Sequence, residues 1–248
     1  MTPVAEAPTP IARSSQRPEP LLCELHAHST WSDGELSLPA LVDLYGQAGF
    51  DVLCVADHAY QDGRHINREN YGRYLEAIAA EADRAARRYD MIVIPGLELT
   101  FDDPDPARTA HAFAVGLETF PPLEHGLAAS LRAARQAGAA LIAAHPYTLE
   151  HCKSTVRPTG GFAAGWEVLA PLVDRIELFN RDELFAWAAE SGVPPVATGD
   201  FHRPEHLETW KTLLPCAKDP QDVVRYLRSS RPAYLTRLET AQAESLAA

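Results

Sequence analysis

Residues 21–34 read LLCELHAHSTWSDG. An apolar run leads into His26 and His28, so we expect a buried strand that ends at this pair. Alternate residues of a strand lie on the same face, so the two imidazoles should point into the same small volume. Two neighbouring imidazoles and a nearby carboxylate, here Asp33, are typical of half of a divalent metal site. The rest of such a site must come from elsewhere in the chain.

Beyond this stretch, short apolar runs alternate with helix-like segments. The expected strands are 21–26, 51–57, 91–98, 111–116, 139–144, 174–180, 195–199 and a last one at 233–236. The expected helices are 38–49, 69–89, 123–138, 183–191 and 219–228. We expect the strands at 91–98 and 111–116 to form a hairpin, and a loop at 153–165. This alternation is typical of a parallel sheet, and about seven units predict a single-domain α/β fold, a distorted TIM-like (β/α)7 barrel.

The bulk composition is that of a globular domain. The chain has 248 residues, 46% of them hydrophobic, and a formal net charge of −12, which disfavours non-specific binding to nucleic acid or anionic membranes. We expect a disordered Pro-rich leader at 1–20, one domain at 21–238 and a flexible tail at 239–248. The four cysteines form no CxxC pair, and no signal peptide or membrane-length run is present. We therefore expect a cytoplasmic protein that contacts no membrane and has no obligate protein partner.

Metal-binding residue types recur where the apolar strands end. In TIM-type barrels, active sites lie at the C-terminal ends of the strands. Single strand-end residues of this kind are usually loop or surface residues, but accidents at five strand ends are improbable. The positions are His26, His28, His58, Glu98, His145, Asp200 and His202, with His111 joining them if the hairpin folds back.

The motifs HAHSTWSDG, ADH, GLE, a downstream histidine, AHP and GDFH resemble the PHP (polymerase and histidinol phosphatase) superfamily. They occur in the family's order and span residues 26 to 202. The resemblance implies a distorted (β/α)7 barrel, a site for two or three divalent ions and phosphoester hydrolysis. It implies nine ligands, with Glu98 as the bridging carboxylate: His26, His28, Asp33, His58, Glu98, His111, His145, Asp200 and His202. Asp33 matches a position that varies among relatives.

The ligand types and positions also predict roles in a reaction. Nitrogen and oxygen ligands without cysteine suit Mn²⁺, Fe²⁺ or Zn²⁺. A water shared by two such ions is the expected nucleophile. Asp200 and His202 could assist proton transfer as well as bind metal, and Asp57 is a candidate supporting residue beside His58. Among several loop cations, which include Arg64, Arg181 and Arg203, we favour Lys153 and Arg157 for binding a phosphate.

These inferences favour a metal-dependent phosphoesterase that acts on a small phosphomonoester or on a nucleotide-type phosphoester, including oligonucleotide ends. One alternative is an amidohydrolase-type enzyme that cleaves C–N or C–O bonds. Such enzymes often use a carboxylated lysine as the bridge, and no lysine lies at an expected strand end. A second alternative is a non-catalytic, metal-binding regulatory module. The complete ligand set argues against that reading.

Overall fold

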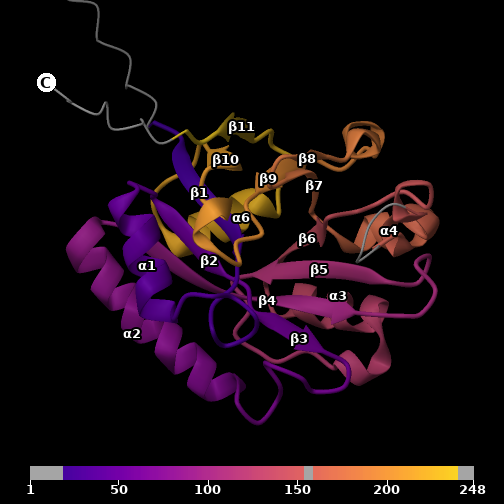
Figure 1. Ribbon diagram of the computed structural model, residues 1–248, viewed down its shortest axis with the longest axis horizontal. Coiled ribbons are helices and arrows are strands. Elements are labelled where there is room, and N and C mark those ends of the chain that lie inside the picture. Colours follow the sequence, from indigo (N-terminus) through magenta and orange to yellow (C-terminus); the bar gives the residue numbers. More distant parts are fainter. Residues whose placement is uncertain (1–18, 154–158, 240–248) are drawn as a thin grey trace, which may run out of the picture.

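The computed structural model describes residues 19–153 and 159–239 and has an α/β fold (Figure 1). Its helices are α1 Leu38–Gln47, α2 Tyr71–Tyr89, α3 Leu127–Gln136, α4 Gly161–Ala164, α5 Trp166–Leu169 and α6 Pro220–Leu227. Its strands are β1 Leu21–Ala27, β2 Val52–Val55, β3 His58–Tyr60, β4 Ile92–Phe101, β5 Ala110–Val115, β6 Ala140–Ala144, β7 Arg175–Asn180, β8 Glu183–Leu184, β9 Pro195–Thr198, β10 Trp210–Leu214 and β11 Tyr234–Arg237. Almost all of the predicted leader and tail lies outside the described residues, as does Arg157.

The strands form one curled sheet in the order β11-β10-β1-β2-β4-β5-β6-β7-β8, with β3 paired to β4 and β9 to β7. Neighbours β1–β2, β2–β4, β6–β7 and β7–β9 are parallel. A bridge between Ala27 and Phe201 brings the segment after β9 against the end of β1, which curls the sheet. The α/β class is confirmed. A regular (β/α)7 barrel is not, because β5 is antiparallel to both its neighbours and follows β4 as the predicted hairpin, without a helix between them.

Two apolar clusters pack against opposite faces of the sheet. On β2, Leu53 and Val55 belong to the outer cluster, which α1 and α2 cover, whereas Val52 and Cys54 belong to the inner one. Alternation along a buried strand divides its side chains in this way. Helix α6 contributes Val223, Tyr226 and Leu227 to the inner cluster. In Figure 1, α1 and α2 lie side by side against the sheet.

The helix termini follow partly from their sequences. Pro39 lies in the first turn of α1, whereas the Ser37 side chain before it makes no capping hydrogen bond. Asp219 caps α6 by accepting from the backbone N–H groups of Gln221 and Asp222. Helix α2 ends where Asp90 adopts a left-handed conformation with φ 51°.

The predictions for two segments were wrong. Residues 183–191, expected as a helix, form β8 and the 3₁₀ helix Ala186–Glu190, because Phe185 is buried and the Trp187 indole donates to the Pro146 carbonyl. These tertiary contacts override the local helix preference. The expected loop at 153–165 contains α4. Strands β3 and β10 were not predicted.

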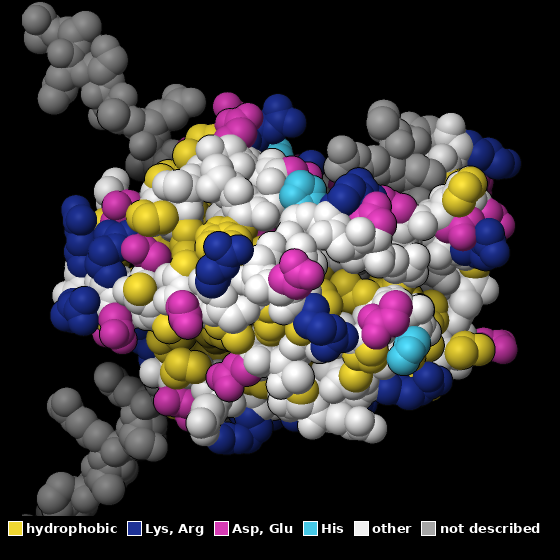
Figure 2. All heavy atoms as spheres, turned by 90° about the horizontal axis from the view of Figure 1, so that it is seen from below, with side chains coloured by type: hydrophobic (Ala, Val, Ile, Leu, Met, Phe, Trp, Pro, Cys, Tyr) yellow, Lys and Arg dark blue, Asp and Glu magenta, His cyan; other side chains and the backbone are white. Residues whose placement is uncertain are grey.

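Several observations bear on the expected environment of the protein. No described helix is both long and apolar enough to cross a membrane. All four cysteines are free thiols. On the face shown in Figure 2, basic and acidic side chains are intermingled.

Candidate metal centre

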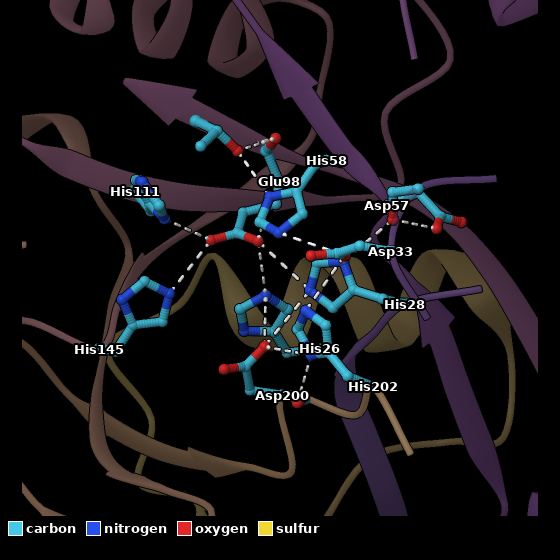
Figure 3. Close-up of polar contacts among 12 residues, drawn as sticks. His26, His28, Asp33, Asp57, His58, Glu98, His111, His145, Asp200 and His202 are labelled. Atoms are coloured by element: carbon cyan, nitrogen blue, oxygen red, sulfur yellow. Dashed lines mark hydrogen bonds and ion pairs between the residues drawn. The ribbon is translucent and has the colours of Figure 1, made fainter. Parts of the chain in front are cut away.

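The fold brings all nine predicted ligands into one region, where the other eight surround Glu98 (Figure 3). The residues come from segments that are distant in sequence. His26 lies on β1, His58 on β3, Glu98 on β4 and His111 on β5. The other five lie in loops next to strands: His28 and Asp33 after β1, His145 after β6, and Asp200 and His202 after β9.

The two carboxylate oxygens of Glu98 face different sets of histidines. Oε2 lies 3.3 Å from Nε2 of His26 and 3.3 Å from Nε2 of His28, and 2.9 Å from Nδ1 of His58. Oε1 lies 3.1 Å from Nδ1 of His111 and 3.2 Å from Nε2 of His145. A carboxylate that divides its oxygens in this way is suited to bridge two cations.

Two more carboxylates complete the centre. Asp33 Oδ1 lies 3.2 Å from Nε2 of His202 and 3.6 Å from Nε2 of His58. Asp200 Oδ1 lies 3.4 Å from Nε2 of His28. Three groups therefore have donor atoms within 4.8 Å of one another: His26, His28 and Glu98; Glu98, His111 and His145; His28, Asp33, His58 and His202.

Unsatisfied buried atoms indicate that this centre suits a cation. Nε2 of His26, Nε2 of His28 and Oε2 of Glu98 are buried and make no hydrogen bond in the described part of the chain. Buried polar atoms normally have a partner, and leaving one unpaired costs about 1–3 kcal/mol. All three atoms belong to one group of donors, so a divalent ion bound there would satisfy them together.

Neighbouring oxygens orient the histidine rings. The Thr100 hydroxyl donates to the Glu98 carbonyl at 3.1 Å, so it accepts from Nδ1–H of His58 at 2.8 Å. Thr159 donates to the carbonyl of His145 at 2.5 Å and accepts from that ring's Nδ1–H at 3.1 Å. In both rings the proton is held on Nδ1, which leaves the Nε2 lone pair available for a metal.

Burial and neighbouring charges together shift the pKa values of residues in the centre. Burial alone would raise the pKa of Glu98, but His58 and His26 hold it well below its usual range. Burial, together with His202 and His58, lowers the pKa of His28 to about 3. Burial lowers the pKa of His111, but hydrogen bonds with Asp102 and Glu98 outweigh it and raise that pKa to about 9. An ionised bridging carboxylate and a neutral His28 are the protonation states that metal binding requires.

Asp57 lies behind the ligands and does not line the cavity described below. Its buried carboxylate accepts from the backbone N–H of Ser29 at 2.8 Å, from the Ser29 hydroxyl at 2.8 Å and from the Ser32 hydroxyl at 2.5 Å. These hydrogen bonds hold the loop that carries His28 and Asp33 in one conformation. Burial raises the pKa of Asp57 to about 6, while the two serines oppose the shift.

The backbone is unusual at two of the ligands. His145 has φ 28° and Asp200 has φ 40°, both in the left-handed region that residues other than glycine rarely adopt. His145 directly follows β6, and Asp200 comes two residues after the end of β9, so the chain turns sharply at both places and directs the side chains into the centre. Such conformations persist only where surrounding contacts enforce them.

Seven of the nine predicted ligands, all except His26 and His28, line a cavity of about 1030 Å³. Two arginines, Arg181 and Arg203, also line it, together with Tyr147, His151, His206, Asn180, Glu35 and Glu183. Arg181 donates to the Asp200 carboxylate at 2.9 Å, whereas Arg203 is exposed and has no ion pair among the described residues. Lys153 is exposed and is not among the lining residues, and Arg157 lies outside the described residues.

The sequence reasoning missed several supporting residues, namely Thr100, Thr159 and Glu177. Of these, Glu177 had a visible signal, since it is a charged residue in the middle of the strand RIELFN. The two threonines had none, because a threonine in or near a strand usually reflects strand preference alone.

A comparison with solved structures finds proteins that share this fold. The chain superimposes on a two-domain protein from Bacteroides vulgatus ATCC 8482, described as containing a predicted PHP-like metal-dependent phosphoesterase. The TM-score is 0.66 and the identity 21%, over 93% of this chain and 70% of that one. The chain has the PHP-like fold. The predicted resemblance to the PHP superfamily is thereby confirmed at the level of the fold.

Further similarities are weaker or partial. A protein from Bifidobacterium adolescentis ATCC 15703, described as a putative metal-dependent phosphoesterase, superimposes with a TM-score of 0.50 and 14% identity, over 73% of this chain and 87% of that one. The DNA polymerase/3'-5' exonuclease PolX of Bacillus subtilis is 26% identical over 220 residues, which are 79% of this chain. The match spans only 36% of PolX. No protein-family model matches the chain.

Proposed function

We propose that this chain is a metal-dependent phosphoesterase that hydrolyses a small phosphomonoester or a nucleotide-type phosphoester. The observation that carries the proposal is the division of the Glu98 carboxylate between two sets of histidines at the wall of an open cavity. A reaction at phosphorus needs this kind of charge stabilisation, because positioning and electrostatics supply most of its catalysis.

Three donor groups define where cations would be held: His26, His28 and Glu98; Glu98, His111 and His145; His28, Asp33, His58 and His202. We assign two or three ions to them, with Asp200 as a further ligand. The absence of cysteine from the groups favours Mn²⁺, Fe²⁺ or Zn²⁺. When bound, such ions act as Lewis acids that make water more acidic and neutralise charge on phosphoryl oxygens.

The residues of the chain itself would bind and orient the substrate. Arg203 is the exposed cation of the cavity, and Arg181 is anchored through Asp200. We assign both to the phosphoryl oxygens, which guanidinium groups bind well. The assignment of Lys153 and Arg157 to the phosphate stays a prediction. Asp200 and His202 lie where they could also hold the proton that the leaving oxygen takes up.

Two observations support the nucleotide-type alternative. The cavity volume of about 1030 Å³ is large enough for a substrate of nucleotide size. The similar curated protein is named as a polymerase and 3'-5' exonuclease, but the chain spans about a third of its length. We therefore extend only the phosphoester chemistry to this chain.

The test is metal analysis of the purified protein combined with a substrate panel of aryl phosphate mono- and diesters, nucleotides, amides and lactones. We expect at least two bound ions per chain and hydrolysis of phosphate monoesters or phosphate diesters. Cleavage of amides or lactones alone would indicate the amidohydrolase alternative. Bound metal without any turnover would indicate a binding module, and the absence of both would overturn the proposal.

A further inference from the structure

A second buried carboxylate lies behind the candidate metal centre, on the opposite side of His26 from Glu98. Glu177 is fully buried in β7. Its Oε1 is 3.1 Å from Nδ1 of His26, whose Nε2 lies 3.3 Å from Oε2 of Glu98. The His26 ring therefore lies between two carboxylates, one on each nitrogen.

The same carboxylate holds three other groups. Its Oε1 accepts from the Thr198 hydroxyl at 2.5 Å. Its Oε2 accepts from the backbone N–H of His145 at 2.6 Å and from the Asn180 amide at 2.9 Å. Four donors fill the roughly four lone-pair sites of a carboxylate. A buried carboxylate so completely occupied has one fixed orientation.

We propose that Glu177 is a positioning residue that sets the geometry of two of the donor groups at once. Through Nδ1 it fixes the His26 ring so that the Nε2 lone pair is directed at Glu98. Through the backbone N–H it holds His145 in its left-handed conformation of φ 28°. His26 belongs to one donor group and His145 to another, and Glu98 is their shared member.

The inference rests on the metal centre of the proposed function but not on its phosphoesterase activity. Outer hydrogen-bond partners of metal-binding histidines typically change metal affinity by 10–100-fold when they are removed. Because Glu177 contacts both groups, we expect its loss to weaken both, whereas loss of Thr100 should affect only the group that contains His58.

The chain offers a matched control on the same strand pair. Asp174 immediately precedes β7 and accepts from the backbone N–H of Leu141, near the start of β6, at 2.9 Å. Glu177 makes the same kind of contact with the backbone N–H of His145, just beyond the end of β6. Asp174 also contacts Arg135 and no predicted ligand. Asp174→Asn and Glu177→Gln therefore remove the same kind of contact at opposite ends of β6.

The experiment measures Co²⁺ binding to the full-length wild type and to Glu177→Ala, Glu177→Gln and Asp174→Asn, by equilibrium dialysis and by visible absorption of the bound Co²⁺. We expect Glu177→Ala to weaken binding by at least 10-fold and to change the absorption spectrum. The side-chain amide in Glu177→Gln has one oxygen and one NH₂ group. This variant should therefore keep the hydrogen bonds made to one oxygen of Glu177 and lose those made to the other. Asp174→Asn should bind Co²⁺ like the wild type.

Wild-type stoichiometry, affinity and spectrum in both Glu177 variants would overturn the inference while leaving the proposed function intact. Failure of the wild type itself to bind Co²⁺ would overturn both. If Glu177→Ala does not fold, as judged by circular dichroism, the near-isosteric Glu177→Gln decides the question, because it removes acceptor capacity with little change in volume.

Discussion

Nε2 of His28 lies 3.3 Å from Oε2 of Glu98, and neither atom has a hydrogen bond in the described part of the chain. Both are buried, so the arrangement carries a free-energy cost of about 1–3 kcal/mol for each unpaired atom. A cation held between them removes that cost. Metal binding and folding stability should therefore be coupled.

Divalent metal should raise the thermal stability of the protein. At 100 times its dissociation constant, a ligand that binds only the folded state adds about 2.7 kcal/mol, which for a domain of this size raises Tm by about 5–10 °C. Scanning fluorimetry with Mn²⁺ or with EDTA measures the shift. His28→Ala should abolish it, and His125→Ala, an exposed histidine outside the centre, should preserve it. Equal Tm values with and without EDTA would contradict this prediction.

Replacing Glu98 by Gln should disable two donor groups together. The amide retains one oxygen and places an NH₂ group against the other set of histidines, so one side of the bridge is lost. We expect the loss of at least one metal ion per chain by elemental analysis, and a fall in kcat/KM of more than about 100-fold. Glu118→Gln, an exposed change, is the control. Full metal content in Glu98→Gln would show that this carboxylate does not bridge.

Alanine at Arg181 or Arg203 should weaken substrate binding without loss of metal. A hydrogen bond to a charged group is worth about 1.5–3 kcal/mol, so KM for an aryl phosphate should rise about 10–100-fold in each variant. Arg181 also contacts Asp200, so its variant should lower kcat as well. Arg132→Ala, on the exposed face of α3, serves as the reference. Unchanged steady-state kinetics would remove the arginine concerned from the binding site.

A buried ion pair supports the loop that carries Asp200. Lys211 Nζ lies 3.0 Å from Oε2 of Glu24, both side chains are fully buried, and Glu24 also accepts from the backbone N–H of Gly199. Lys211→Met leaves a buried charge unpaired and should cost about 3–5 kcal/mol in urea unfolding.

The double variant Glu24→Gln with Lys211→Met should recover part of that loss, because no uncompensated charge remains. Lys218→Met, which breaks a more exposed pair with Asp51, should cost less than about 1 kcal/mol. A cost for Lys211→Met no greater than that of Lys218→Met would disprove the importance of the buried pair.

His206 should make the metal-free protein sensitive to mild acid. Burial and the nearby Arg181 lower the pKa of His206 to about 4, and its Nδ1 accepts from the His202 N–H at 3.1 Å. An unfolded histidine has a pKa of about 6.5, so the unfolded state takes up the proton first. The stability contributed by the neutral ring is complete above pH 6.5 and declines as the pH falls towards 4.

Urea unfolding of metal-free wild type and His206→Gln at a series of pH values tests this point. The ring is partly exposed and solvent screens its charge, so the wild type should lose about 1 kcal/mol more than the variant across this interval. Parallel curves for the two proteins would exclude His206 as the source of the acid sensitivity.

The sequence predicted most of the strands and the ligand positions because the same pattern encodes both. Each of these strands is an apolar run, and a polar residue such as His28 or His145 directly follows its end. The antiparallel pairing of β5 was also predictable, from the turn-rich segment between Glu98 and His111. What the sequence did not reveal depends on contacts between distant residues.

Two cases show this limit. Residues 183–191 contain helix-forming alanines, yet Trp187 and Phe185 are fixed by packing against residues that local preference cannot take into account. Arg181 and Lys153 both lie in segments expected as loops and carry the same charge, so nothing local distinguishes them. Only the folded chain shows that Arg181 lines the cavity and that Lys153 does not.

Each donor group draws its members from separate parts of the chain: His26 with Glu98, Glu98 with His145, and His28 with His202. No short fragment contains a complete group, and the group of His28, Asp33, His58 and His202 cannot form until the segment after β9 has closed on β1. Sheets dominated by such non-local pairings form slowly. Metal binding by that group must therefore come at the end of folding, and its occupancy reports that the chain has reached its final topology.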